Sequence, residues 1–166
     1  MKYLSITYPD LENGCGCRVT LWVAGCSHHC LGCHNPETWD YEAGKDFTTK
    51  SYQDLKEILK LPYIKGIPLS GGDPLYKDNI TGILTLCEKI RQDFPSKDIW
   101  LYTGYTWEQI LKNPALKEVL NYIDVLVEGP FVQELRDISL AFRGSSNQRI
   151  VDVKQSLKEN KFVIWA

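Results

Sequence analysis

The sequence predicts an α/β fold in which a mainly parallel sheet forms an open, partial (β/α) barrel. Apolar, strand-like segments alternate with amphipathic, helix-like segments between residues 18 and 127, as in α/β proteins. Polar motifs directly follow the predicted strands. The chain has 166 residues, whereas a closed eight-fold barrel needs about 250 residues. We therefore expect a single domain over residues 1–166 with an open sheet.

The predicted elements follow the order β-α-β-α-β-α-β, for which parallel strands and right-handed crossovers are the rule. Strands are predicted over residues 18–24, 64–69, 98–102 and 122–127, with further short strands over 149–153 and 161–165. Helices are predicted over residues 51–60 and 77–94, and from Thr106 to residue 121 with an interruption at Asn113-Pro114. Ser51 is a plausible N-cap of the first helix, and Thr106 and Gln109 have capping-box spacing.

The composition is that of a globular protein, with 43% hydrophobic and 24% charged residues. A net charge of −2 gives no electrostatic reason to expect a nucleic-acid partner. No apolar run is long enough to span a membrane, and the N-terminus lacks the pattern of a signal peptide. We therefore predict a cytoplasmic protein. In that reducing compartment, six cysteines indicate metal or redox chemistry rather than disulfides.

Three of the cysteines, Cys26, Cys30 and Cys33, form a C-x3-C-x2-C loop directly after the first predicted strand. Closely spaced thiolates on one loop can bind three irons of a 4Fe–4S cluster and leave the fourth iron open to another ligand. Structural zinc is the alternative, and counting ligands does not exclude it, although zinc sites favour paired C-x2-C spacing. Candidates for a fourth zinc ligand are Cys15, Cys17, His28, His29 and His34.

Other polar motifs follow the remaining predicted strands. The Gly71-Gly72-Asp73 motif follows the second strand, Thr103-Gly104 the third, and Glu128 the fourth. Sites in such folds lie at the C-terminal ends of parallel strands. We therefore expect these motifs to meet the cysteine loop at one rim of the sheet.

The cysteine loop resembles the signature of the radical S-adenosylmethionine (SAM) superfamily. Further motifs are similar to those of the activating proteins of anaerobic ribonucleoside-triphosphate reductase. They are Asn13-Gly14 with Gly16 and Arg18, Gly25-Cys26, Asn35-Pro36-Glu37-Thr38-Trp39, SGGDPL at 70–75, LYTGYTWE at 101–108, DVLVEGPFV at 124–132 and RGSSNQR at 143–149. The resemblance covers residues 10–153 and implies a truncated barrel of the radical SAM type.

This resemblance implies an oxidoreductase in which Cys26, Cys30 and Cys33 hold the cluster and SAM binds the open iron. Reductive cleavage of SAM then gives methionine and a 5′-deoxyadenosyl radical, which takes a hydrogen atom from a glycine of the large reductase subunit. An external electron donor such as flavodoxin is implied by this chemistry. A homodimer, or a complex with the reductase, also follows from the resemblance.

The residues that the resemblance assigns to SAM lie beside the third cysteine or at the end of a predicted strand. They are Gly32, Cys33, His34, Gly71, Gly72, Asp73, Thr103, Gly104 and Glu128. Glycines let the backbone approach a ligand closely. Each assignment has a plainer alternative: a solvated loop histidine, ordinary turns, and a surface carboxylate at Glu128, where the family usually has aspartate.

Two further groups of residues have no settled role. Arg143, Asn147, Gln148 and Arg149 form a polar run that would bind the SAM carboxylate, face the partner protein or remain solvated. Cys15 and Cys17 depart from the family, and a redox pair, an extra metal site and no role at all are equally compatible with their spacing. Core positions are predicted for Cys87, Trp22, Trp100 and Trp165.

Two rival functions follow from the same residues. The first is another radical SAM reaction, either on a different glycyl radical enzyme or on a small molecule. The second is a non-catalytic adaptor that binds an iron–sulfur cluster or zinc. The glycine-containing motifs Gly71-Gly72-Asp73 and Thr103-Gly104 are expected to form a glycine-rich rim at the strand ends. This rim argues against the adaptor, because an adaptor needs no second ligand pocket.

Overall fold

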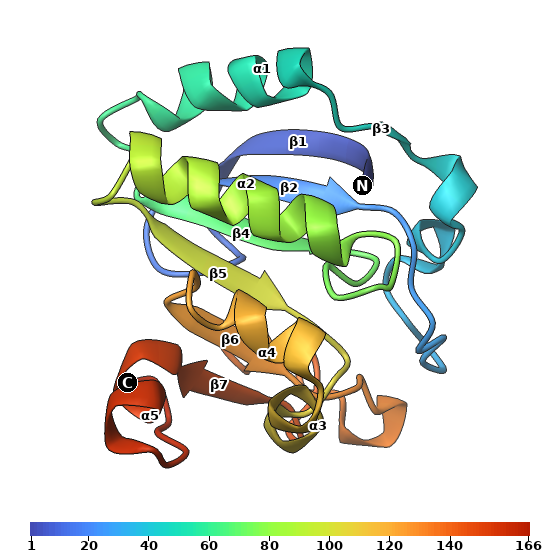
Figure 1. The fold of residues 1–166 in the computed structure, drawn as a ribbon. Coiled ribbons are helices and arrows are strands. Elements are labelled where there is room, and N and C mark those ends of the chain that lie inside the picture. The colour runs from blue at the N-terminus through green and yellow to red at the C-terminus, as the bar shows by residue number, and fades with distance from the viewer.

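The computed structural model describes residues 1–166 as one seven-stranded sheet with helices packed against it (Figure 1). The strands are β1 (Lys2–Asp10), β2 (Arg18–Val23), β3 (Lys45–Asp46), β4 (Gly66–Gly71), β5 (Asp98–Tyr102), β6 (Val125–Glu128) and β7 (Arg149–Asp152). The α-helices are α1 (Thr49–Leu59), α2 (Ile80–Asp93), α3 (Trp107–Lys112), α4 (Pro114–Val119) and α5 (Val153–Glu159). Short 3-10 turns lie at Pro36–Thr38, Tyr41–Ala43 and Gln133–Leu135.

The sheet is open and mixed rather than mainly parallel. Its strand order is β3-β1-β2-β4-β5-β6-β7. The four central strands β2, β4, β5 and β6 are parallel, as the alternation of strands and helices predicts. The outer strands pair antiparallel because β1 enters β2 through a short loop and β7 returns alongside β6 without a crossover helix. Neither β1 nor β3 was expected from the sequence.

Most of the core lies between the sheet and the helices α1, α2, α3 and α4, which Figure 1 shows on one side of the strands. The register aligns Leu21 with Leu69, Leu69 with Leu101, and Leu101 with Leu126. These four leucines are fully buried. Because side chains alternate along a strand, the residues next to them point to the opposite face of the sheet. That face carries the site described below.

Several predicted boundaries shift in the structure. Helix α1 begins after Thr48, which is its N-cap, while Ser51 is the third helical residue and returns the hydrogen bond in a capping box. The predicted capping box of Thr106 and Gln109 is confirmed. The strand predicted over residues 161–165 is reduced to a single bridge between Val151 and Ile164. Helix α5 was not predicted.

A smaller apolar cluster lies on the other face of the sheet. Trp100, which is 1% exposed, contacts Phe142 and Trp165 edge-on, with ring centroids 5.4 and 5.0 Å away. The C-terminal residues therefore support the loop that carries Phe142. The prediction of a core position is confirmed for Trp100, but Trp22 is half-buried, and its indole Nε1 donates a hydrogen bond to the Thr7 hydroxyl.

We expect Trp165→Ala to lower the free energy of unfolding by about 1–2 kcal/mol, because a half-buried ring loses two aromatic neighbours. Ile164→Ala is the matched control, since Ile164 is 67% exposed and its loss should cost less than about 0.5 kcal/mol. Urea unfolding of both variants measures the difference. Equal stability of the two variants would show that the C-terminal residues do not support the sheet.

Candidate functional site

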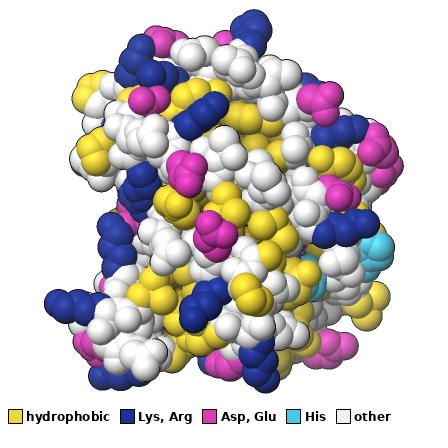
Figure 2. Space-filling view, in the orientation of Figure 1, with side chains coloured by type: hydrophobic (Ala, Val, Ile, Leu, Met, Phe, Trp, Pro, Cys, Tyr) yellow, Lys and Arg dark blue, Asp and Glu magenta, His cyan; other side chains and the backbone are white.

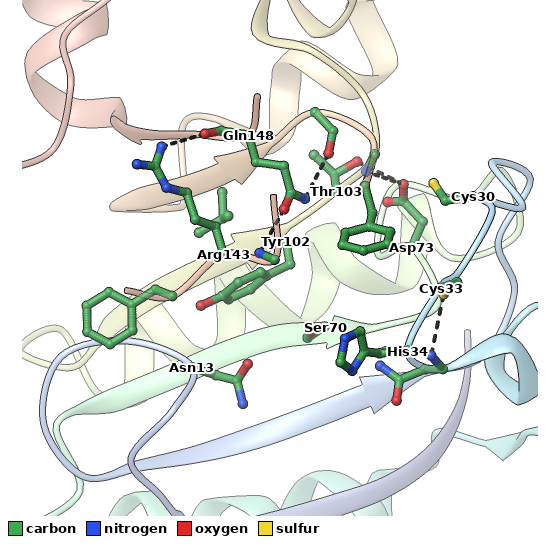
Figure 3. A pocket seen from close by; sticks show the side chains of 18 of the residues that line it. Asn13, Cys30, Cys33, His34, Ser70, Asp73, Tyr102, Thr103, Arg143 and Gln148 are labelled. Atoms are coloured by element: carbon green, nitrogen blue, oxygen red, sulfur yellow. Dashed lines mark hydrogen bonds between the residues drawn. The ribbon is translucent and has the colours of Figure 1, made fainter. Parts of the chain in front are cut away.

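A cavity of about 930 Å³ occupies the face of the sheet opposite α2. Its floor is made by the strand residues next to the buried leucines, namely Trp22, Ser70, Tyr102 and Val127. Its walls come from the loop after β2, from the loops after β4 and β5, and from residues 136–144. Figure 3 shows the cysteines at one end of this cavity and Asn13 at the other.

The loop after β2 is held at both ends by backbone hydrogen bonds. The Gly25 N–H donates to the Thr38 carbonyl at 2.7 Å, and the Cys26 N–H donates to the Trp39 carbonyl at 3.1 Å. Figure 2 shows histidine side chains at the right-hand edge of the molecule, beside this loop. All three histidines of the chain lie within residues 28–34.

Cys26, Cys30 and Cys33 all line the cavity and are partly buried. The structure does not gather their thiols, or any other three acidic, histidine or cysteine side chains, into a metal-binding arrangement. The Asn35 N–H donates to the Cys33 sulfur at 3.4 Å, and such N–H···S contacts are typical around iron–sulfur ligands. Three thiols on one loop, with a backbone donor to one of them, suit a 4Fe–4S cluster.

Burial raises the pKa of the Cys26 thiol above its usual value, and the nearby carboxylate of Asp73 raises it further. Metal ligands must be thiolates, so metal binding at Cys26 displaces a proton.

Gly71 and Gly72 hold the end of β4 tightly against the end of β2. Gly71 has φ +103°, and a Cβ there would lie 2.7 Å from both the nitrogen and the oxygen of Val23. A Cβ on Gly72 would lie 2.5 Å from the Gly25 carbonyl oxygen. Both glycines line the cavity. Their lack of a side chain is therefore required by the fold itself.

We expect Gly71→Ala to destabilise the protein by about 2–4 kcal/mol, because the new methyl group would add a backbone clash to an unfavourable φ. Gly129→Ala is the matched control. Gly129 has a similar φ of +99°, but a Cβ there would have no neighbour closer than 3.7 Å, so strain alone should cost about 1–2 kcal/mol. Thermal and urea unfolding compare the two variants. Equal losses would contradict the assigned clash.

Asp73 links the three loops that follow β2, β4 and β5. Its side chain is almost fully buried, at 1% exposure. One carboxylate oxygen accepts from the Thr103 hydroxyl at 2.9 Å and the Gly104 N–H at 3.1 Å, and it lies 2.7 Å from His28 Nε2. The other accepts from the Leu75 N–H at 2.8 Å. From the sequence, His28 was a candidate only for zinc binding, so this contact was not predicted.

Glu128 is buried at 1% exposure, which rules out the alternative of a surface carboxylate. It accepts a hydrogen bond from the Trp107 N–H at 2.7 Å and forms an ion pair with Arg149. Arg149 also pairs with Glu108 at 2.9 Å. This network ties β6 and β7 to the start of α3.

The other sequence-predicted residues divide between the cavity and its surroundings. Residues that line the cavity are Cys33, His34, Gly71, Gly72, Asp73, Thr103, Gly104, Arg143 and Gln148. Residues that do not line it are Gly32, Glu128, Asn147 and Arg149. A Cβ on Gly32 would meet the Gln133 side chain at 2.8 Å. Asn147 donates from its amide to the Pro130 carbonyl at 2.8 Å.

Arg143 and Gln148 stabilise the loop along one wall of the cavity. Arg143 Nη1 donates to the Gln148 carbonyl at 2.6 Å (Figure 3). The Gln148 side-chain oxygen accepts from the Gly144 N–H at 2.9 Å and from the Ser145 N–H at 3.1 Å. On another wall, the His34 ring lies edge-on to Phe131 at 6.1 Å. These contacts among protein residues set the shape of the cavity walls.

Tyr102 is a cavity residue that sequence analysis missed. Its hydroxyl is buried without a hydrogen-bond partner, and burial raises the pKa of this phenol well above its usual value. Strand alternation was the signal for its position, because Leu101 points into the helix-covered core.

The three remaining cysteines lie outside the cavity. Cys15 is exposed and Cys17 is half-buried, and neither forms a disulfide. Cys87 is fully buried on α2, which confirms its predicted core position.

None of the five α-helices has the length and hydrophobicity that a membrane crossing requires.

The chain is similar to one protein family and to several named proteins over most of its length. A family described as a 4Fe-4S single cluster domain matches residues 12–151. The anaerobic ribonucleoside-triphosphate reductase-activating protein of Escherichia coli (strain K12) is 48% identical over 144 residues, covering 85% of this chain and 92% of that protein. The protein of the same name from Enterobacteria phage T4 is 43% identical over 150 residues, covering 90% and 93%. The chain therefore belongs to the family of anaerobic ribonucleoside-triphosphate reductase-activating proteins and contains their 4Fe-4S single cluster domain.

Proposed function

We propose that this protein is a radical SAM activase that generates a glycyl radical on anaerobic ribonucleoside-triphosphate reductase. One observation carries the proposal: three thiols from one loop and a glycine-rich rim from two other loops line a single cavity. Its volume, about 930 Å³, lies in the upper part of the range of roughly 300–1,000 Å³ found for small-molecule sites. The relatives are named for activation of that reductase.

Each group of cavity residues has a distinct task in this proposal. Cys26, Cys30 and Cys33 would hold the cluster. When bound, the cluster and SAM would supply the radical chemistry, in which SAM is reductively cleaved and the resulting 5′-deoxyadenosyl radical takes a hydrogen atom from the target glycine. The rim of Gly71 and Gly72 would let SAM lie close to the backbone. His34 would pack against the adenine.

Asp73 would act mainly through the backbone that it orders. Its carboxylate oxygens already accept hydrogen bonds from the Thr103 hydroxyl and from the N–H groups of Leu75 and Gly104. The carbonyl groups of this rim are therefore the better candidates for receiving the SAM ammonium. The ion pair of Glu128 with Arg149 supports an analogous indirect role, in which it stabilises the strand beside the cavity rather than binding the ribose.

The open sheet supports the proposal of a protein substrate. A truncated barrel of the radical SAM type would let a glycine-bearing loop of the reductase approach the cavity from the side. Arg143 borders the cavity, where it would meet either SAM or that loop. We further propose an external electron donor such as flavodoxin, and a homodimer or a complex with the reductase as the working assembly.

The test uses the full chain under anaerobic conditions. The protein is reconstituted with iron and sulfide, reduced, and studied by electron paramagnetic resonance with and without SAM. We expect a reduced-cluster signal that changes on adding SAM, formation of 5′-deoxyadenosine, and a glycyl radical signal once the reductase is added. A cluster that does not respond to SAM would favour the adaptor function. Cleavage of SAM without a radical on the reductase would point to another glycyl radical enzyme.

A further inference from the structure

We propose that His28 is a positioning residue that fixes the cysteine loop relative to the SAM-binding rim through its hydrogen bond to Asp73. This inference rests on the proposed function, because it concerns the same cavity. His28 lies between Cys26 and Cys30 in the loop. Its Nε2 is 2.7 Å from the Asp73 carboxylate, and its side chain is 18% exposed.

The ring of His28 occupies a defined slot. Tyr105 packs edge-on against it, with ring centroids 4.7 Å apart. On another side, a Cβ on Gly104 would lie 2.6 Å from the imidazole. A side chain at position 104 would therefore collide with the ring. The imidazole is thus held by residues from the loops after both β4 and β5.

The loop has few other means of holding its position. Its backbone is tied at Gly25 and Cys26 on one side, and the Cys33 N–H bonds back to the Cys30 carbonyl within the loop. No backbone N–H of residues 27–32 donates to a backbone carbonyl. The contact between His28 and Asp73 is the one hydrogen bond that joins residues 27–32 to another part of the chain.

Asp73 is well suited to receive this contact. The same carboxylate oxygen accepts from the Thr103 hydroxyl and the Gly104 N–H, so its position is fixed by the rim itself. A buried carboxylate with these partners acts as a rigid acceptor for the imidazole. The link therefore sets the separation between the thiols of the loop and the backbone proposed to bind SAM. Outer residues that orient ligands typically change metal affinity or activity by about 10–100-fold when replaced.

The experiment compares His28→Ala with His28→Gln. The glutamine amide can also donate to Asp73, whereas alanine cannot. His29→Ala is the control for losing a loop imidazole, because His29 stacks on Trp39 at 4.5 Å and is not bonded to Asp73. The readouts are iron content, the SAM dissociation constant of the reconstituted protein, and hydrogen exchange of residues 26–34 in the iron-free protein. Circular dichroism establishes that each variant is folded.

We expect His28→Ala to bind SAM about tenfold more weakly than the wild type or worse, and to exchange faster over residues 26–34. It should still bind iron, because the three thiols remain. His28→Gln should recover most of the SAM affinity and protection, and His29→Ala should stay within about twofold of the wild type, well below that tenfold threshold.

Three results would overturn the inference. The first is unchanged SAM affinity and unchanged exchange in His28→Ala. The second is a His28→Gln variant no better than His28→Ala, because the hydrogen bond would then not be the cause. The third is a loss of SAM affinity in His29→Ala equal to that in His28→Ala. Failure of the proposed function is recognised separately, since the wild-type protein would then show no SAM binding at all.

Discussion

Cys30→Ser is expected to lower bound iron from about four atoms per chain, the content of one cubane cluster, to background. The three cysteines of the loop are the thiols that line the cavity. A serine hydroxyl is a poor replacement for a thiolate ligand, and two remaining thiols are too few to retain a cubane. Iron and sulfide analysis of the reconstituted protein, together with its electron paramagnetic resonance spectrum, measures the loss.

Cys15→Ser provides the matched control for this experiment. Cys15 is exposed and lies outside the cavity, so its replacement should leave the iron content unchanged. Full iron content in Cys30→Ser would remove that residue from the ligand set. Stoichiometric zinc in the purified wild-type protein, with no cluster after reconstitution, would instead support the structural zinc site that the spacing alone leaves open.

Asp73→Ala is expected to lower the free energy of unfolding by about 3–5 kcal/mol. The buried carboxylate accepts hydrogen bonds from the Thr103 hydroxyl and from the N–H groups of Leu75 and Gly104. Its removal leaves all of these donors without their acceptor in a largely buried site, where each unmade bond is costly. Urea unfolding monitored by circular dichroism measures the change.

Asp78→Ala is the control, because this nearby carboxylate is exposed and its loss should cost less than about 0.5 kcal/mol. Asp73→Asn keeps one oxygen acceptor and should fall between the wild type and Asp73→Ala. If Asp73→Ala does not fold, the intermediate stability of Asp73→Asn still tests the assignment. A folded Asp73→Ala protein as stable as Asp78→Ala would contradict the role of Asp73 as the link between the three loops.

The central strands and the longest helix are encoded locally, and for that reason they could be predicted. The run at residues 18–23 is apolar and β-branched enough to predict β2 by itself. The capping box at Thr106 and Gln109 involves residues three positions apart. By contrast, β1 has mixed polarity and is stabilised by pairing with β2 and β3, which no local pattern reports.

The candidate site likewise combines features that the sequence predicts with features that depend on tertiary structure. The spacing of the cysteines and the glycine-rich turn after β4 are short-range features, so both could be picked out from the sequence as candidate site motifs. The rule that parallel strands end at one edge also predicted that these motifs would lie together. Tyr102 could also have been predicted to face the cavity, because side chains alternate along a strand and its neighbour Leu101 points into the core.

Sequence by itself thus determined the central β-α units, the cysteine loop and the approximate place of the site. Only the tertiary structure decided how those parts are joined. His28 meets Asp73 across 45 positions, Asp73 meets Thr103 across 30, and Arg149 meets Glu128 across 21. The physical reason is that these polar contacts depend on the relative placement of separate strands. A local pattern of residue types constrains a turn or a helix. It does not specify which distant donor will form a hydrogen bond to a given buried carboxylate.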